Sequence, residues 1–156
     1  MSATTGPTLA GFQDFVYGVM KIDPLNLPTS EPVIGYAFDV AMSVVNYVLK
    51  VVRSPPNGQW SIYAMAVYNL GGSNLVNYAQ DQPGRTFFDD LRKSLGINKF
   101  QAGVVSSTSD TGTSVALLNP DFMREITLAN LQQIKDPWGR QYLQFAQDYG
   151  TLWGLS

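Results

Sequence analysis

The sequence predicts a mainly α protein, a helical bundle of about five to six helices from which one long β-hairpin-like loop protrudes. Apolar residues recur at helical spacing along several stretches, which is the pattern of helices that bury one face. Capping residues and prolines mark the starts of these stretches. Residues 104–118 lack this period and carry residue types that favour strands and turns. A length of 156 residues fits one domain with a core of its own.

The first helix is predicted at residues 9–20, with Thr8 as its N-cap. Its apolar face has helical spacing, with Phe15 beside it, and consists of Leu9, Phe12, Val16, Val19 and Met20. We expect residues 1–7 to form a flexible tail. They contain neither the basic start nor the apolar run of a signal peptide. Prolines in residues 21–30 predict an extended connection, because proline cannot donate to a helix and restricts the residue before it.

The second helix is predicted to begin at Glu31 and Pro32 and to continue to about residue 52. This stretch is apolar enough to raise the possibility of a membrane span. A polar stripe along it instead predicts an amphipathic helix and no membrane partner. The stripe consists of Asp39, Ser43, Asn46 and Lys50.

The third helix is predicted at residues 60–79 and is apolar on nearly all sides, which indicates burial on nearly all sides. In a monomer it would be the central helix, and in an assembly part of its surface could contact another subunit. Gly71 and Gly72 would either kink this helix or let another helix approach it closely.

The next helix is predicted at residues 87–95, with a reciprocal capping box between Thr86 and Asp89 and with Gly96 as its stop. Asp89 and Lys93 form a favourable i,i+4 pair. Its inward-facing residues are Phe88, Leu91 and Leu95.

The C-terminal helices are predicted after Thr127 and after Asp136, where Pro137 takes the first helical position. The last helix ends at Gly150, and we expect the apolar tail at residues 151–156 to pack on the body or on a neighbour. The last helix carries an aromatic face made of Trp138, Tyr142, Phe145 and Tyr149.

Residues 104–118 are the most informative stretch for function. Residues 106–114 contain seven Ser or Thr side chains with one Asp and one Gly, between two short apolar arms. Hydroxyl side chains compete with the backbone for hydrogen bonds and resist helix, and Gly112 can adopt positive φ in a turn. The alternative is a disordered surface loop, but the apolar arms favour an ordered protrusion that docks on a partner. Its docking candidates are Val104, Val105, Ser107, Ser109, Asp110, Gly112, Val115 and Leu117.

Composition limits the function classes. Charged residues are 14% of the chain, against roughly 25% in globular domains, so little ionic surface would need desolvation on assembly. The net charge of −2 supplies no basic footprint for nucleic acid. The chain has no Cys and no His, which excludes disulfides, thiolate metal sites, imidazole bases and nearly all zinc sites. We expect no cofactor and no metal.

Pairs of carboxylates are the candidate catalytic groups in this sequence, and we interpret them as structural. Asp89, Asp121 and Asp136 lie in first turns or caps, where negative charge offsets the helix dipole. No phosphate-binding glycine motif occurs, and no base is evident for the hydroxyl cluster. We therefore predict that the protein is not an enzyme. A small helical carboxylate-dependent hydrolase or binding domain using Asp121 and Glu125 is the alternative.

Aromatic residues are sufficient for a core, and some are candidates for an interface, because Trp, Tyr and Arg are enriched at interface hot spots. Trp138 with Arg140, at a helix start beside Pro137, is the pair that we expect to contact a partner. Trp153 in the apolar tail is a further candidate.

The C-terminal half of the chain resembles small structural proteins encoded in tailed-bacteriophage virion gene clusters. The resemblance is strongest over about residues 100–156. It is carried by residues 105–114, VSSTSDTGTS, and by residues 136–143, DPWGRQYL, with QDYG at residues 147–150. In size and layout the chain looks most like the head-to-tail adaptor, or connector, proteins.

The resemblance implies a helical bundle with a long hairpin or loop, forming a homo-oligomeric ring, typically twelve-fold, between the portal protein and the tail or nozzle proteins. The protein would then be a virion component, assembled in the host cytoplasm, with DNA passing nearby without specific binding. Residues 104–118 would be the docking arm and residues 151–156 a terminal contact. A different phage structural role, in head completion, the tail or the baseplate, is the alternative within this class.

Overall fold

A computed structural model describes residues 6–55, 58–98 and 133–149 of the chain. The prediction of a mainly α protein is confirmed, since the described residues form helices and no strand. Three predicted segments lie outside the described residues. They are the hairpin at residues 104–118, the part of the helix after Thr127 as far as residue 132, and the tail at residues 151–156. The described elements are α1 (Leu9–Asp14), the π-helix η1 (Phe15–Val19), α2 (Pro32–Val44), the 3-10 helix η2 (Tyr47–Val51), α3 (Ile62–Tyr78), α4 (Phe87–Leu95) and α6 (Pro137–Asp148).

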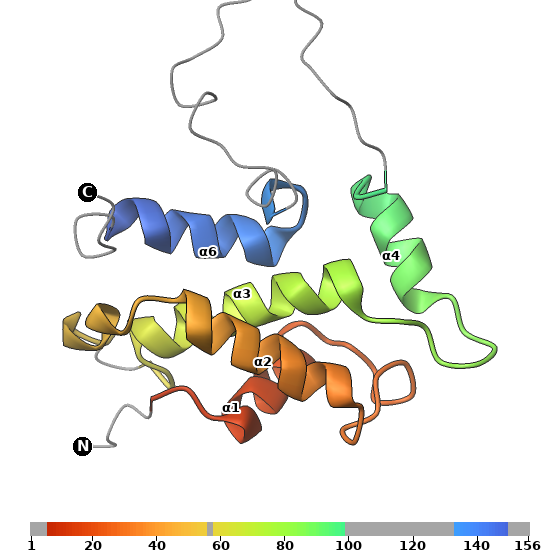
Figure 1. Ribbon diagram of the computed structural model, residues 1–156, viewed down its shortest axis with the longest axis horizontal. Coiled ribbons are helices and arrows are strands. Elements are labelled where there is room, and N and C mark those ends of the chain that lie inside the picture. Colours follow the sequence, from red (N-terminus) through yellow and green to blue (C-terminus); the bar gives the residue numbers. More distant parts are fainter. Residues whose placement is uncertain (1–5, 56–57, 99–132, 150–156) are drawn as a thin grey trace, which may run out of the picture.

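Helix α3 is the centre of the described fold (Figure 1), with α6 on one side, α1 and α2 on the other, and α4 near its C-terminal end. Ser61 caps it, with its hydroxyl oxygen accepting from the N–H of Ala64 at 3.1 Å. Thirteen of its 17 residues are buried, which confirms the prediction that it is the central helix.

Gly71 and Gly72 let other side chains approach α3 closely, and the helix continues through them without a break. A Cβ on Gly71 would lie 2.8 Å from the ring of Phe12, and one on Gly72 would lie 2.9 Å from the sulfur of Met20. Close approach, the second of the two roles predicted for this glycine pair, is therefore the one that the structure has.

Helix α1 begins as predicted, because the Thr8 hydroxyl accepts from the N–H of Gly11 at 3.0 Å. Its buried face differs from the prediction: Leu9 and Val19 are exposed, while Phe15 is buried together with Phe12 and Val16. For Val19 the cause is η1, in which it lies and in which the N–H of Met20 bonds to the carbonyl oxygen of Phe15, five residues back. This wider turn rotates the residues that follow it relative to an ideal α-helix.

Helix α2 begins at Pro32 as predicted but ends at Val44, eight residues before the predicted end at about residue 52. Val45 has an extended backbone, and the Asn46 side chain accepts from the N–H of Val48 at 3.0 Å and caps η2. Asn offers the backbone this local alternative to a continuing helix. The predicted polar stripe is correct for Asp39, Ser43 and Lys50, which are exposed.

Helix α4 has the predicted bounds and the predicted stop, with Gly96 at φ +67. The predicted capping box is wrong. The carboxylate of Asp81 in the preceding loop accepts from the N–H groups of Phe88 and Asp89, at 2.7 and 3.0 Å. The Thr86 hydroxyl instead donates to Asp90. The ion pair between Asp89 and Lys93 forms as predicted. Phe88 is buried, while Leu91 and Leu95 are half-buried.

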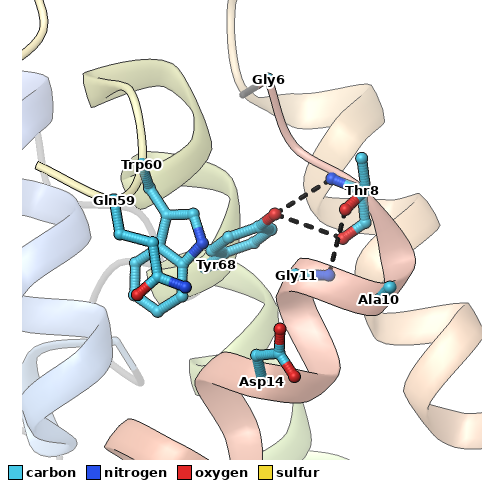
Figure 2. Close-up of a pocket in the computed structure, with 8 residues that line it drawn as sticks. All are labelled: Gly6, Thr8, Ala10, Gly11, Asp14, Gln59, Trp60 and Tyr68. Atoms are coloured by element: carbon cyan, nitrogen blue, oxygen red, sulfur yellow. Dashed lines mark hydrogen bonds between the residues drawn. The ribbon is translucent and has the colours of Figure 1, made fainter. Parts of the chain in front are cut away.

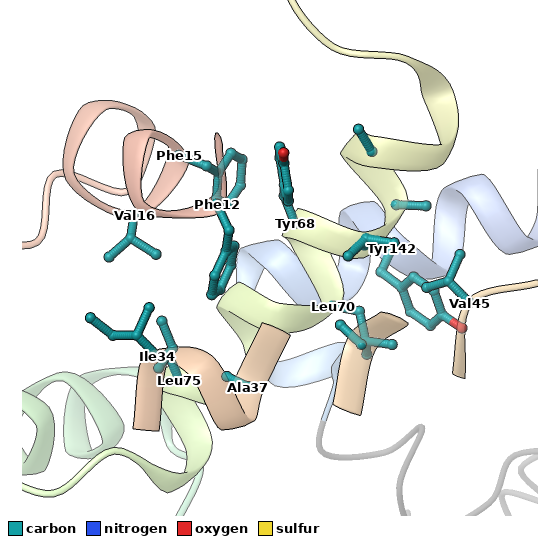
Figure 3. Packing of buried hydrophobic residues seen from close by; sticks show 14 of the residues in the cluster. Phe12, Phe15, Val16, Ile34, Ala37, Val45, Tyr68, Leu70, Leu75 and Tyr142 are labelled. Atoms are coloured by element: carbon teal, nitrogen blue, oxygen red, sulfur yellow. The ribbon is translucent and has the colours of Figure 1, made fainter. Parts of the chain in front are cut away.

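The hydrophobic core lies where α1, η1 and α2 meet α3, and it extends to α6 (Figure 3). Tyr142 of α6 is buried, and the other three residues of the predicted aromatic face pack against the core while partly exposed. Across residues 6–55, 58–98 and 133–149, no helix has the length and apolar character that a membrane crossing requires.

Candidate functional site

The start of α6, where sequence analysis places Trp138 and Arg140, is held against α3 by a buried carboxylate. Asp136 is fully buried and caps α6, with Oδ1 accepting from the N–H of Gly139 at 2.7 Å. Its Oδ2 accepts from the Ser73 hydroxyl at 2.7 Å and from the Asn77 amide at 3.3 Å. Burial raises the pKa of Asp136, although these hydrogen bonds act in the opposite direction. The predicted cap is therefore also a polar link between two helices.

The contacts that the structure shows for Trp138 and Arg140 are with other residues of this chain. The indole of Trp138 is partly buried and lies edge-on to Phe15, with ring centroids 5.4 Å apart. The exposed Arg140 donates from Nη1 to the carbonyl oxygens of Ile134 and Lys135 at 3.1 and 3.3 Å. Their contact with a partner stays a prediction. The remaining predicted docking residues lie outside the described residues: Val104, Val105, Ser107, Ser109, Asp110, Gly112, Val115, Leu117 and Trp153.

An aromatic cluster connects the start of α6 to the N-terminal end of α3. Phe15 also contacts Trp60, at 5.8 Å between ring centroids, and Tyr68, at 5.9 Å. Trp60 and Tyr68 are perpendicular at 5.4 Å. Such edge-to-face pairs are favourable because the positive edge of one ring meets the negative face of another. Trp60 and Trp138 thus both pack on one ring from η1.

A pocket of about 240 Å³ opens beside this cluster (Figure 2). The hydroxyl of Tyr68 lies at the pocket and accepts from the backbone N–H of Thr8 at 3.0 Å. It is also within 3.3 Å of the carbonyl oxygen of the same residue, to which it can donate. The bare Cα of Gly11 makes room for this hydroxyl. The residues that line the pocket are Gly6, Thr8, Ala10, Gly11, Asp14, Gln59, Trp60 and Tyr68.

Asp14 is the ionised group in this lining. Its carboxylate is exposed, and among the described residues it has no hydrogen-bond or ion-pair partner. The sequence alone does not identify Asp14 as a site residue, because in a helical pattern it is simply the solvent-facing residue between buried Phe12 and Phe15. Only the tertiary fold brings Trp60, 46 positions further on, to the same pocket.

A second surface of interest is an apolar row on the outer side of α2 and η2. Its four members are 56–76% exposed although each is large and hydrophobic, and they are Tyr36, Val44, Tyr47 and Val51. Tyr36 and Val44 are eight residues apart and lie on the same side of α2. We call this set the apolar row.

The acidic residues of the described part offer no metal centre, since residues 6–55, 58–98 and 133–149 contain no group of three potential ligands. Asp89 pairs with Lys93, and Asp136 acts as a cap, which agrees with the structural interpretation of these two carboxylates. Asp121 and Glu125, the pair named for a hydrolase, lie outside the described residues.

Comparison with protein-family models, with curated proteins and with solved structures finds no match to this chain.

Proposed function

We propose that the protein is a structural virion component that forms a head-to-tail adaptor ring between the portal and the tail of a tailed bacteriophage, and that it catalyses no reaction. The observation that carries this proposal is the apolar row, together with the resemblance of residues 105–114 and 136–150 to phage structural proteins. Tyr47 and Val51, the first and last residues of η2, are 70% and 76% exposed. Large apolar side chains that gather on one exposed surface favour contact with another protein.

The low charge of the chain supports the same proposal. With 14% charged residues, a subunit can be covered by neighbours with little cost in desolvating ionic groups. The apolar row then supplies a hydrophobic contact to a neighbouring copy, while residues 104–118 engage the portal. The net charge of −2 is compatible with DNA passing through the ring without being held.

A deletion of residues 106–114 tests the docking role of the arm. The described core contains none of these residues, so we expect the deletion variant to fold with an unchanged helical circular dichroism spectrum. We expect it to be missing from purified particles, as measured by quantitative mass spectrometry. A matched control replaces the same nine residues with an equally long Gly-Ser segment, which separates loss of the side chains from loss of length. Normal incorporation of both variants would contradict the docking role.

The ring itself is tested by electron microscopy of particles and by a charge placed on the apolar row. Val44→Lys should leave the folded monomer intact and reduce ring formation, while Ser43→Lys, an exposed polar position beside it, should assemble normally. A density for this chain in the baseplate, the tail or a head-completion complex would replace the adaptor assignment by one of those roles. Equal assembly of the two lysine variants would remove the apolar row from the interface.

A further inference from the structure

The pocket between α1 and the start of α3 has an unusual balance of groups. Its charged lining residue is Asp14, and its aromatic lining residues are Trp60 and Tyr68. Figure 2 shows the Asp14 carboxylate on the α1 side, and across from it the indole and the amide of Gln59 on the segment that leads into α3. Among the described residues, no basic side chain lines the pocket. A guest there would meet one negative charge and an electron-rich indole.

Two of the backbone hydrogen-bond donors at the N-terminus of α1 are already engaged at this place. Helix N-termini favour anions, so the partial positive charge at this end of α1 opposes the negative charge of the Asp14 carboxylate. The N–H of Gly11 donates to the Thr8 hydroxyl, and the N–H of Thr8 donates to the Tyr68 hydroxyl. A helix end corresponds to about half a charge, whereas Asp14 carries a full one. The balance of charge in the pocket therefore favours a cation.

We propose that this pocket binds the guanidinium or ammonium group of an arginine or lysine side chain supplied by a protein partner. The carboxylate of Asp14 pairs with the cation, and the indole of Trp60 supplies a cation–π contact. The Gln59 amide oxygen accepts a further hydrogen bond from the guest. This inference does not rest on the proposed role in a phage particle.

A side chain fits the pocket better than a free diamine does. The pocket offers one carboxylate, so a single positive charge is matched, while the second ammonium of a diamine would have no counter-charge there. At about 240 Å³ and open to solvent on one side, the pocket accepts the end of a long side chain whose backbone stays outside.

The local helix geometry supports a binding role. The π-helix η1 begins at Phe15, directly after Asp14, and the ring of Phe15 packs on Trp60. Single π turns inside α-helices occur frequently at functional sites. Here the π turn begins directly after Asp14, and its first residue, Phe15, packs edge-on against the indole that forms one wall of the pocket.

Nuclear magnetic resonance titration of the full chain with Nα-acetyl-arginine amide tests the proposal. The neutral isostere Nα-acetyl-citrulline amide is the matched ligand control. We expect saturable shifts of the Trp60 indole N–H and the Gly11 amide with the arginine ligand, with Kd on the order of 1 mM, and none with citrulline. The Trp60 indole signal is assigned from a Trp60→Phe variant.

Asp14→Asn should weaken binding by about fivefold or more, because it removes the ion pair at an exposed site where the fold does not depend on the charge. Asp39→Asn, an exposed helical carboxylate outside the pocket, should leave Kd unchanged. The proposal is overturned if citrulline binds as well as arginine, if Asp14→Asn binds like the parent protein, or if no saturation occurs up to about 10 mM ligand. Tighter binding of 1,4-diaminobutane than of the arginine ligand would overturn the assignment to a protein side chain.

Discussion

Helices α2 and α3 have similarly apolar sequences but opposite surroundings. In α3, 13 of 17 residues are buried, whereas α2 buries three of 13, namely Ile34, Ala37 and Ala41. The difference comes from neighbours: α3 contacts α2, α4, α6 and η2, while α2 packs mainly against α3 and α1 and leaves its outer side open. Apolar composition alone therefore does not determine burial.

The comparison also separates two uses of apolar side chains. Those of α3 stabilise the fold of this chain, because they are removed from water within it. Those of the apolar row on α2 and η2 contribute little to the fold, because they are still mostly in water. They remain available for an intermolecular contact, which is the basis of the proposed assembly role.

The same substitution in the two helices should have very different effects. Val67→Ala in α3 removes two fully buried methyl groups and should lower the free energy of unfolding by about 2–3 kcal/mol. Val44→Ala in α2, at a side chain that is 56% exposed, should change it by less than about 0.5 kcal/mol. Urea denaturation of both variants measures the difference. Similar losses at the two positions would mean that Val44 is covered in the isolated protein.

The sequence was sufficient to predict much of the fold. Thr8 and Asp136 each accept from an N–H three residues on, as predicted, and such local caps can be inferred from neighbouring residues. The end of α4 at Gly96 followed from the same kind of local signal.

Three features of the structure were missed, and only the pocket among them depends on residues far apart in the sequence. The cap of α4 comes from Asp81, which a capping-box pattern at Thr86 does not reveal. The break of α2 after Val44 reflects a local competition between the Asn46 side chain and the helix, in a stretch whose apolar period continues. The pocket at Asp14 is assembled from three separate segments, so only the folded chain shows it.

Two polar residues of α3 extend the comparison, because Ser73 is buried and Asn77 is half-buried, whereas Asp39 and Ser43 of α2 are exposed. Ser73 and Asn77 both donate hydrogen bonds to Asp136. Asp136→Ala should lower the free energy of unfolding by about 2 kcal/mol, since it removes the cap and leaves the buried Ser73 hydroxyl without its acceptor, while the Asn77 amide keeps its bond to the carbonyl oxygen of Ser73. Asp136→Asn keeps an acceptor for the N–H of Gly139 and should cost less at pH 7. Thermal and urea unfolding of the two variants distinguish these losses.

The dependence on pH separates the charge of Asp136 from its hydrogen bonds. Because the pKa of the folded protein is raised above the ordinary value of 3.8, the unfolded chain loses this proton first as the pH rises. The part of the stability that depends on protonation of Asp136 is therefore full below pH 3.8 and is lost as the pH rises through the raised pKa, while the hydrogen bonds that Asp136 accepts remain at pH 7. Relative to Asp136→Asn, whose amide does not titrate, the parent protein should become less stable over this window. A constant difference between the two proteins from pH 3 to pH 7 would show that burial does not raise this pKa.

The smallest effects are expected at two helical glycines, and they should have opposite signs. A Cβ at Gly71 of α3 would lie 2.8 Å from the Phe12 ring, which is itself fully buried, whereas a Cβ at Gly35 of α2 meets no atom within 4 Å. Alanine is favoured over glycine in a helix by about 0.5–1 kcal/mol. Gly35→Ala should gain this amount in full. At Gly71 the overlap with Phe12 exceeds the gain, so Gly71→Ala should be less stable than the parent protein by about 1 kcal/mol.

The midpoint of thermal unfolding of the two alanine variants, measured side by side, gives both signs in one experiment. If Gly71→Ala were also stabilising, the Phe12 ring would have room to move. The packing of α1 on α3 would then not be what excludes a larger side chain at residue 71. If Gly35→Ala were destabilising, some other surface would have to cover α2 in the isolated protein. Opposite signs would mean that α3 is closely packed along the side that faces α1, while α2 has room for an added methyl group at Gly35.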